Sequence, residues 1–225
     1  MFDNLLTIIA PHYCCSCGNV GHLLCHSCKL NIARTRVIGC VLCTKPAVFG
    51  ICYRHKVAYQ QVWCVGIRHG TLEVLIDVFK FQRALEAARH LADLAHMILP
   101  KTNVPTVIVP IPTASPHVRA RGYDHMQQVA HYLSKKSGIP IRALLTRQHH
   151  LTQHLAVSRQ IREAQAKSAF HINQVLDATI HYIILDDVIT SGATISAAAM
   201  ALKRAGATHI SVIALARQPL STFAQ

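Results

Sequence analysis

Short apolar runs and amphipathic stretches alternate along the chain from about Val62 to the C-terminus. Four of the apolar runs are continuous, rich in Val and Ile, and bounded by turn residues, as buried strands are. These predicted strands are 62–67, 106–110, 181–186 and 209–216. Two shorter runs, 142–145 and 169–172, predict further strands.

The stretches between the strands carry apolar residues three and four positions apart, which is the spacing of an amphipathic helix. Helices are predicted over 71–79, 84–99, 123–136 and 194–205. The apolar face of the first is Leu72, Leu75, Ile76 and Phe79, and that of the second is Leu85, Ala88, Leu91, Ala92 and Ala95. Gly206 follows the last helix, where a glycine commonly ends a helix.

Strands that are apolar along their length and alternate with helices indicate a parallel sheet covered on both faces. We therefore expect an α/β domain over residues 61–225, with a parallel sheet flanked by helices. Ligands of such sheets bind beyond the carboxyl ends of the strands. Asp186 and Asp187 come at such an end and are the first candidates for a functional site.

Residues 1–60 lack this periodicity and are instead rich in cysteine, since all nine cysteines lie in the first 64 residues. Four tight turns of the C-x-x-C or C-x-x-H type follow one another, and two such turns close one tetrahedral zinc shell. We expect two structural zinc ions, in sequential pairing, that replace a hydrophobic core. The expected ligands are Cys14, Cys17, Cys25 and Cys28 for one ion, and Cys40, Cys43, Cys52 and His55 for the other.

The spacing also permits an interleaved pairing, in which the first and third turns share a metal. Disulfides are disfavoured because they need an oxidising compartment, for which the chain offers no export signal. A redox pair would be a single motif rather than four. Cys15 and Cys64 are left over and are expected to pack without binding metal.

The formal net charge of +13 and a pI near 9.6 favour polyanionic partners such as nucleic acids or nucleotides. An apolar share of 51% is enough for a buried core. The N-terminal stretch lacks the basic start of a targeting signal, and no apolar run of 18 residues is present, so no membrane insertion is expected. We expect a cytoplasmic protein.

The stretch 182–195 reads YIILDDVITSGATI, an apolar run followed by two acids, hydroxyl residues and a glycine before an alanine-rich helix. The backbone amides of Thr190, Ser191, Gly192, Ala193 and Thr194 can cradle one phosphate at the helix N-terminus. Carboxylates repel phosphate, so Asp186 and Asp187 must face hydroxyl donors or a divalent cation. A ribose 5′-phosphate satisfies both demands.

At these residues the chain resembles the type I phosphoribosyltransferases, whose pattern of D-D, two residues and T-[ST]-G-x-T binds 5-phosphoribosyl 1-pyrophosphate (PRPP). The cysteine turns, FKF at 79–81, VPIP at 109–112 and RGYD at 121–124 follow in the order of the ComF/GntX family. The resemblance covers nearly the whole chain. It implies a phosphoribosyltransferase-like domain behind a double zinc ribbon, and a link to competence, DNA uptake and natural transformation.

The resemblance implies further roles. Arg121 and Gly122 would form the pyrophosphate loop, and magnesium would accompany PRPP. Asp186 and Asp187 would stabilise the positively charged sugar during catalysis. Gln153, Arg159 and Arg162 would belong to a flexible loop that closes over PRPP, although a basic stretch of this kind can equally be a solvated helix.

Two positions depart from the family, which commonly has Asn where Asp124 and Gln165 stand. An acid at position 124 would repel a polyanion unless a cation offsets it. Tyr123 could stack on a base or simply pack.

Three functions stay open on the sequence. The first is a phosphoribosyltransferase that handles imported single-stranded DNA, with other DNA-uptake proteins as further partners. The second is a PRPP-sensing regulator without catalysis, because a fold does not fix a function. The third is a nucleobase-salvage phosphoribosyltransferase. No residue pattern names the acceptor.

Overall fold

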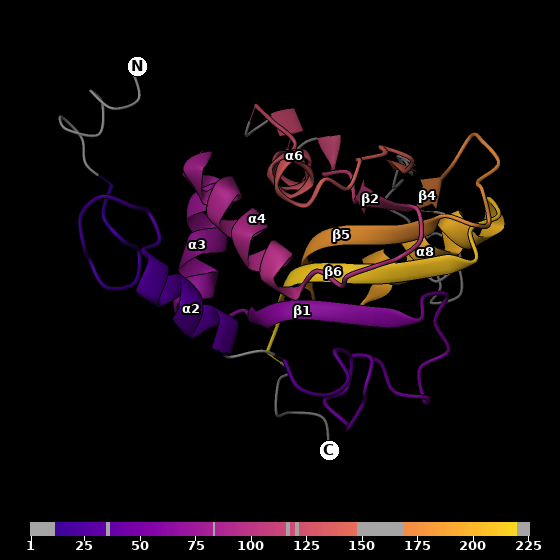
Figure 1. Cartoon of the computed structure of the whole chain (residues 1–225), viewed down its shortest axis with the longest axis horizontal. Helices are drawn as coiled ribbons and strands as arrows, with labels where there is room; N and C mark the ends of the chain where they lie inside the picture. The colour runs from indigo at the N-terminus through magenta and orange to yellow at the C-terminus, as the bar shows by residue number, and fades with distance from the viewer. Residues whose placement is uncertain are drawn as a thin grey trace, which may run out of the picture.

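The computed structural model describes residues 12–34, 37–82, 84–115, 118–119, 122–147 and 169–219. Its centre is a four-stranded sheet in the order β1-β6-β5-β2, in which every neighbouring pair is parallel. The strands are β1 (Gln61–Ile67), β2 (Thr106–Pro110), β5 (His181–Ile189) and β6 (His209–Arg217). The expected parallel sheet flanked by helices is confirmed (Figure 1).

Four helices of the described residues lie where the apolar spacing predicts them, with small shifts at their ends. They are α3 (Gly70–Phe81), α4 (Glu86–Ile98), α6 (His125–Ser137) and α8 (Ala193–Arg204). A further helix, α2 (His26–Arg34), lies in the cysteine-rich part, where the sequence predicted none. The four residues predicted to form the inner face of α3 are all buried. Leu85 is a correction: it precedes α4 as its N-cap residue and is 48% exposed.

The short strands differ from the prediction. Residues 142–145 form no strand, because Ile141 and Arg142 run along the edge of β2 through a bridge and a backbone bond to Ile108. The chain then forms β3 (Thr146–Arg147), which pairs with β4 (Phe170–His171) in a separate antiparallel sheet.

Side chains on the two faces of the sheet form two hydrophobic cores. Ile108, Ile183 and Ile213 pack with α3, α4 and α6 on one face. Val109, Ile184 and Val212 pack with α8 on the other. Burial on both faces explains why these strands are apolar throughout.

The cysteine segments dock on opposite faces of this sheet. Cys14, Leu24 and Ile32 belong to the core of the α3, α4 and α6 face, and the Lys29 ammonium of α2 pairs with Asp93 of α4. The second segment packs Val41 and Tyr59 into the α8 core. Figure 1 shows the first segment beside α2 and α3 and the second beyond β1.

None of the helices in the described part of the chain has the length and apolar character that a membrane crossing requires.

Candidate functional site

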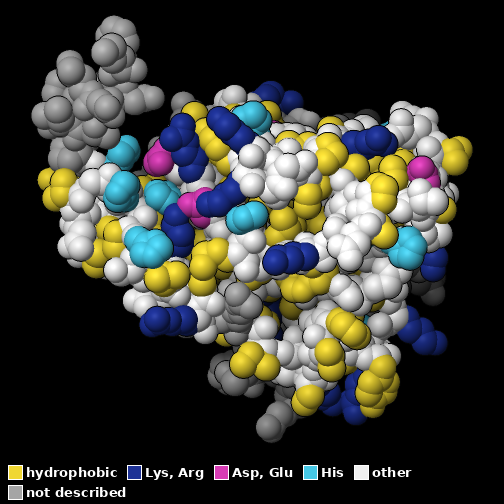
Figure 2. All heavy atoms as spheres, viewed as in Figure 1, with side chains coloured by type: hydrophobic (Ala, Val, Ile, Leu, Met, Phe, Trp, Pro, Cys, Tyr) yellow, Lys and Arg dark blue, Asp and Glu magenta, His cyan; other side chains and the backbone are white. Residues whose placement is uncertain are grey.

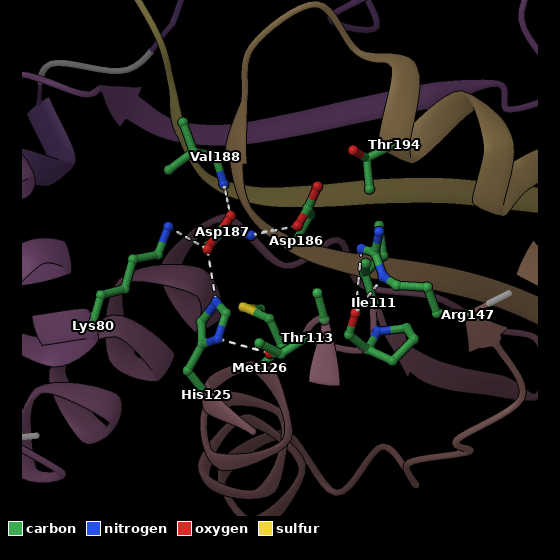
Figure 3. A pocket seen from close by; sticks show the side chains of 12 residues that line it. Lys80, Ile111, Thr113, His125, Met126, Arg147, Asp186, Asp187, Val188 and Thr194 are labelled. Carbon is green, nitrogen blue, oxygen red and sulfur yellow. Dashed lines mark hydrogen bonds and ion pairs between the residues drawn. The ribbon is translucent and has the colours of Figure 1, made fainter. Parts of the chain in front are cut away.

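A pocket of about 310 Å³ lies beyond the carboxyl ends of β2 and β5 (Figure 3). Its lining combines both acids of the sequence motif with basic side chains from three other elements. The lining residues are Lys80, Ile111, Pro112, Thr113, Ala114, His125, Met126, Arg147, Asp186, Asp187, Val188 and Thr194. The pocket has the position that ligand sites take in parallel sheets.

The two acids stand within β5 rather than after it, because the strand extends to Ile189 through its pairing with β6. Asp187 faces α3 and α6, where its Oδ2 lies 2.5 Å from Lys80 Nζ and 2.7 Å from His125 Nε2. Burial alone would raise the pKa of Asp187. The His125 hydrogen bond and the Lys80 charge lower the pKa well below its ordinary value.

Asp186 has the opposite electrostatic environment. Burial, followed by the charge of Asp187, raises the pKa of Asp186 to about 7. Its carboxylate is directed toward Thr194 (Figure 3). Lys80 and Arg147 place two basic side chains in the lining, and the raised pKa of Asp186 weakens the negative charge opposite them, so the pocket favours an anionic ligand.

The N-terminus of α8 opens onto the same pocket through Thr194. Gly192, the N-cap residue, has φ +77° and no side chain to cap the helix. The Ala193 amide donates a long hydrogen bond of 3.4 Å to the Ser191 hydroxyl. A helix N-terminus with exposed Thr190, Ser191 and Ala193 before Thr194 can receive a phosphate.

The carboxylate of Asp124 is held by hydrogen bonds within the fold, which the sequence did not reveal. It caps α6, accepting hydrogen bonds from the backbone of Met126 and Gln127. It also accepts from the backbone N of Thr113 at 2.9 Å and from the Thr113 hydroxyl at 2.8 Å. Its charge is therefore satisfied by fixed donors, and it holds the segment after β2 against α6.

Several predicted site residues cannot be placed here. Arg121, Gln153, Arg159 and Arg162 lie outside the described residues. Gly122 is exposed, with φ +85°, and is not among the residues that line the pocket.

Tyr123 packs into the fold. Its hydroxyl donates to the Phe79 carbonyl at 2.6 Å, and its ring centroid lies 5.8 Å from that of Phe79. Packing, rather than stacking on a base, is its role in this structure.

Sequence reasoning missed four polar residues of the pocket, namely Lys80, Thr113, His125 and Arg147. Lys80 lies in the FKF stretch, and its position between two aromatic residues was the available signal. His125 is one of 16 histidines, so its type alone carried no information. Arg147 lies on β3, where its guanidinium stacks 4.9 Å from the Phe170 ring centroid.

The cysteine turns form two four-residue clusters whose ligand atoms lie within 4.8 Å of one another, in the predicted sequential pairing. The Sγ atoms of Cys17 and Cys25 are 3.6 Å apart, as are those of Cys43 and Cys52. Zinc–sulfur bonds of about 2.3 Å give a tetrahedral edge of about 3.8 Å. Both clusters therefore fit a structural zinc ion.

His55 completes the second cluster, and its buried Nε2 has no hydrogen-bond partner among the described residues, as a metal-binding nitrogen would have none. The two remaining cysteines belong to neither cluster. Cys64 is buried in β1 and donates to the Gly66 carbonyl, and Cys15 packs against the core.

Comparisons with known proteins agree with these features. No family model matches the chain. The DNA utilization protein YhgH of Salmonella typhimurium is 30% identical over 206 residues, which are 82% of this chain and 86% of the relative. Competence protein F of Haemophilus influenzae is 27% identical over 178 residues, covering 75% of this chain and 77% of that protein.

The purine phosphoribosyltransferase of Pyrococcus horikoshii is a solved structure that aligns with 64% of this chain and 76% of its own. Its TM-score of 0.31 and 17% identity are too low to support a conclusion about fold or function. The two sequence relatives each match most of this chain and most of their own length. The chain belongs to the ComF/GntX family, together with these DNA utilization and competence proteins.

Proposed function

We propose that this chain is a PRPP-binding, phosphoribosyltransferase-like protein that acts in DNA utilization. The observation that carries the proposal is the convergence of two adjacent acids, two basic side chains and the N-terminus of α8 on one pocket. The names of its relatives, a DNA utilization protein and a competence protein, support the biological setting. We propose a domain boundary near residue 60, between the cysteine module and the sheet.

The site residues would divide the ligand between them. The loop from Thr190 to Thr194 would bind the 5′-phosphate, and Asp186 and Asp187 would face the ribose hydroxyls. Lys80 and Arg147 would meet the negative charge of the pyrophosphate. Cations fixed where a leaving group gains charge stabilise the transition state more than the ground state, which lowers the barrier to transfer.

We infer that both cysteine clusters hold zinc, and that magnesium accompanies PRPP. Magnesium would neutralise part of the pyrophosphate charge, with the two carboxylates as the nearest protein oxygens. The set of reduced thiols fits a protein of the cytoplasm.

The test is titration of the full-length protein with PRPP and magnesium, followed by a survey of nucleobases, amines and single-stranded DNA for pyrophosphate release. Asp187→Ala should abolish PRPP binding or turnover, because it removes the carboxylate that Lys80 and His125 hold in place. Asp177→Asn, at the opposite end of β5, is the matched control and should retain wild-type affinity.

If Asp187→Ala has the same PRPP affinity and turnover as the wild-type protein, the proposed mechanism is wrong. Binding of PRPP without pyrophosphate release for every acceptor would instead favour a PRPP-sensing regulator. Release with a free nucleobase alone would favour a salvage enzyme.

A second candidate function, binding of single-stranded DNA, is favoured by the surface of the second cysteine segment. Tyr53 is 90% exposed and Phe49 is 56% exposed, although large aromatic side chains are seldom so accessible. Exposed Lys45, Arg54 and Lys56 lie in the same segment. Figure 2 shows hydrophobic and basic side chains side by side in this part of the surface. Aromatic rings beside cations form a stacking platform for unpaired bases.

Fluorescence anisotropy with a labelled oligothymidine tests this function. Affinity should fall steeply as salt rises, because bound phosphates release counterions. Tyr53→Ala should weaken binding about tenfold, in line with the loss of one stacked base. Tyr13→Ala, an exposed tyrosine in the first cysteine segment, should have little effect. The absence of binding at low salt would rule this function out.

A further inference from the structure

The second cysteine cluster contacts the loop that opens the candidate site. A Cβ atom added to Gly192 would lie 2.5 Å from the Cδ2 of Leu42, and its three nearest atoms all belong to that side chain. Leu42 stands between Cys40 and Cys43, two members of the second cluster. The metal-binding turn and the predicted phosphate loop are therefore in direct side-chain contact across about 150 residues of sequence.

The turn that carries Leu42 is held tightly. Thr44 N donates to the Cys40 carbonyl at 2.8 Å, and Cys40 N donates to the Lys45 carbonyl at 2.8 Å. Val41 N donates to the Gly50 carbonyl at 2.9 Å. These bonds and the four converging ligand atoms together fix the turn, and with it the position of Leu42.

The contact continues into the first turns of α8. Val41 and Tyr59 are buried in the same core as Ile195 and Ala199, and Leu42 packs against that core. Among the described residues, the second cluster has a short packing route to the phosphate loop, and the first cluster lies on the other face of the sheet.

We propose that Leu42 is a positioning residue for the phosphate loop, through which an intact second cluster supports PRPP binding. Gly192 has no side chain, and its left-handed conformation is not fixed by a capping group. Leu42 fills the space beside it and restricts the loop to one arrangement, which reduces the ordering that binding requires. This inference rests on the proposed function.

The first test compares PRPP–magnesium affinity by calorimetry in the full-length, zinc-loaded protein. Leu42→Ala should lower affinity about fivefold or more, a typical coupling between sites, and Leu42→Met should restore most of it. Leu24→Ala removes the same group from the first cysteine segment and should leave PRPP affinity unchanged, even if it lowers stability. Zinc content and thermal melting confirm that each variant is folded.

The main comparison of the second test is made in the wild-type protein, so it does not depend on a variant that retains PRPP affinity. Coupling is reciprocal, so PRPP should protect the metal of the second cluster against a chelator, measured as slower zinc release. One zinc of the wild-type protein should respond to PRPP, and the response should disappear in Leu42→Ala. Cys17→Ser, which breaks the first cluster, should retain the responsive zinc.

The outcomes separate the two proposals. If the wild-type protein does not bind PRPP, the proposed function fails and this inference fails with it. If wild-type protein binds PRPP but Leu42→Ala binds equally well, or if PRPP protects neither zinc, the role of Leu42 is overturned while the proposed function stands.

Discussion

At the residue scale, two neighbouring aspartates of one strand have opposite properties. Asp187 turns toward Lys80 of α3 and His125 of α6, and the His125 hydrogen bond and the Lys80 charge hold its pKa low. Asp186 is buried beside a like charge, which raises its pKa to about 7. The alternation of side chains along a strand produces this difference, since adjacent residues face opposite sides of the sheet.

A pH prediction follows from His90 of α4. Burial, with the nearby charge of Lys29, lowers the pKa of His90 to about 4. The unfolded chain takes up this proton near pH 6.5, whereas the folded protein does not until about pH 4, so stability falls as pH drops through this window. Between pH 7 and pH 5, the free energy of unfolding of His90→Leu should therefore rise by about 2 kcal/mol relative to that of the wild-type protein. Urea unfolding at both pH values measures the gain.

Zinc loss at low pH affects the wild-type protein and His90→Leu alike, so the difference between them reports on His90. A difference that stays constant from pH 7 to pH 5 would contradict the buried neutral histidine. Neither ring nitrogen of His90 has a hydrogen-bond partner among the described residues.

At the element scale, two helices use glycine at opposite ends. Gly138 ends α6 with φ +76°, and Gly192 begins α8 with φ +77°. A Cβ at Gly138 would meet nothing within 4 Å, whereas one at Gly192 would overlap Leu42. The same substitution therefore produces backbone strain at one position, and strain together with a clash at the other.

Gly138→Ala should lower the free energy of unfolding by about 1 kcal/mol, the usual cost of a left-handed alanine, and should leave PRPP binding unchanged. Gly192→Ala should lose more stability and should also lose PRPP affinity, because either the Leu42 side chain or the phosphate loop must shift. Urea unfolding and calorimetry measure the two effects. Equal losses in both variants, with PRPP affinity intact, would show that the Leu42 contact does not constrain the loop.

At the scale of the whole molecule, the two cysteine segments dock on the two cores of the sheet, and each carries a four-residue cluster that could hold a metal ion. Elemental analysis should find about two zinc ions per chain, by the rule of four ligands per ion. Chelation should lower the melting temperature and expose the thiols, because metal binding and folding of such modules are coupled. One zinc ion per wild-type chain would contradict the ligand assignment of one cluster. The absence of zinc would contradict the assignment of both clusters.

Much of the fold was predictable from the sequence. The four sheet strands and the faces of α3 and α4 follow from apolar spacing, because burial selects side chains at the period of each element. The boundaries were less certain. β5 continues through both acids because β6 pairs with Asp186, Val188 and Ile189. Residues 142–145 form no strand, and Ile141 and Arg142 follow the edge of β2.

The sequence by itself determined what nearby residues decide: the strands and helices of the sheet domain, the four cysteine turns, and the acids before a helix N-terminus. These features depend on spacing over a few positions, so the chain displays them directly. The tertiary structure decided between the sequential and the interleaved pairing of the turns. The tertiary structure alone decided that Lys80, His125 and Arg147 line one pocket and that Leu42 touches Gly192. These residues come from distant segments, and only the order of the strands and the docking of the cysteine segments bring them together.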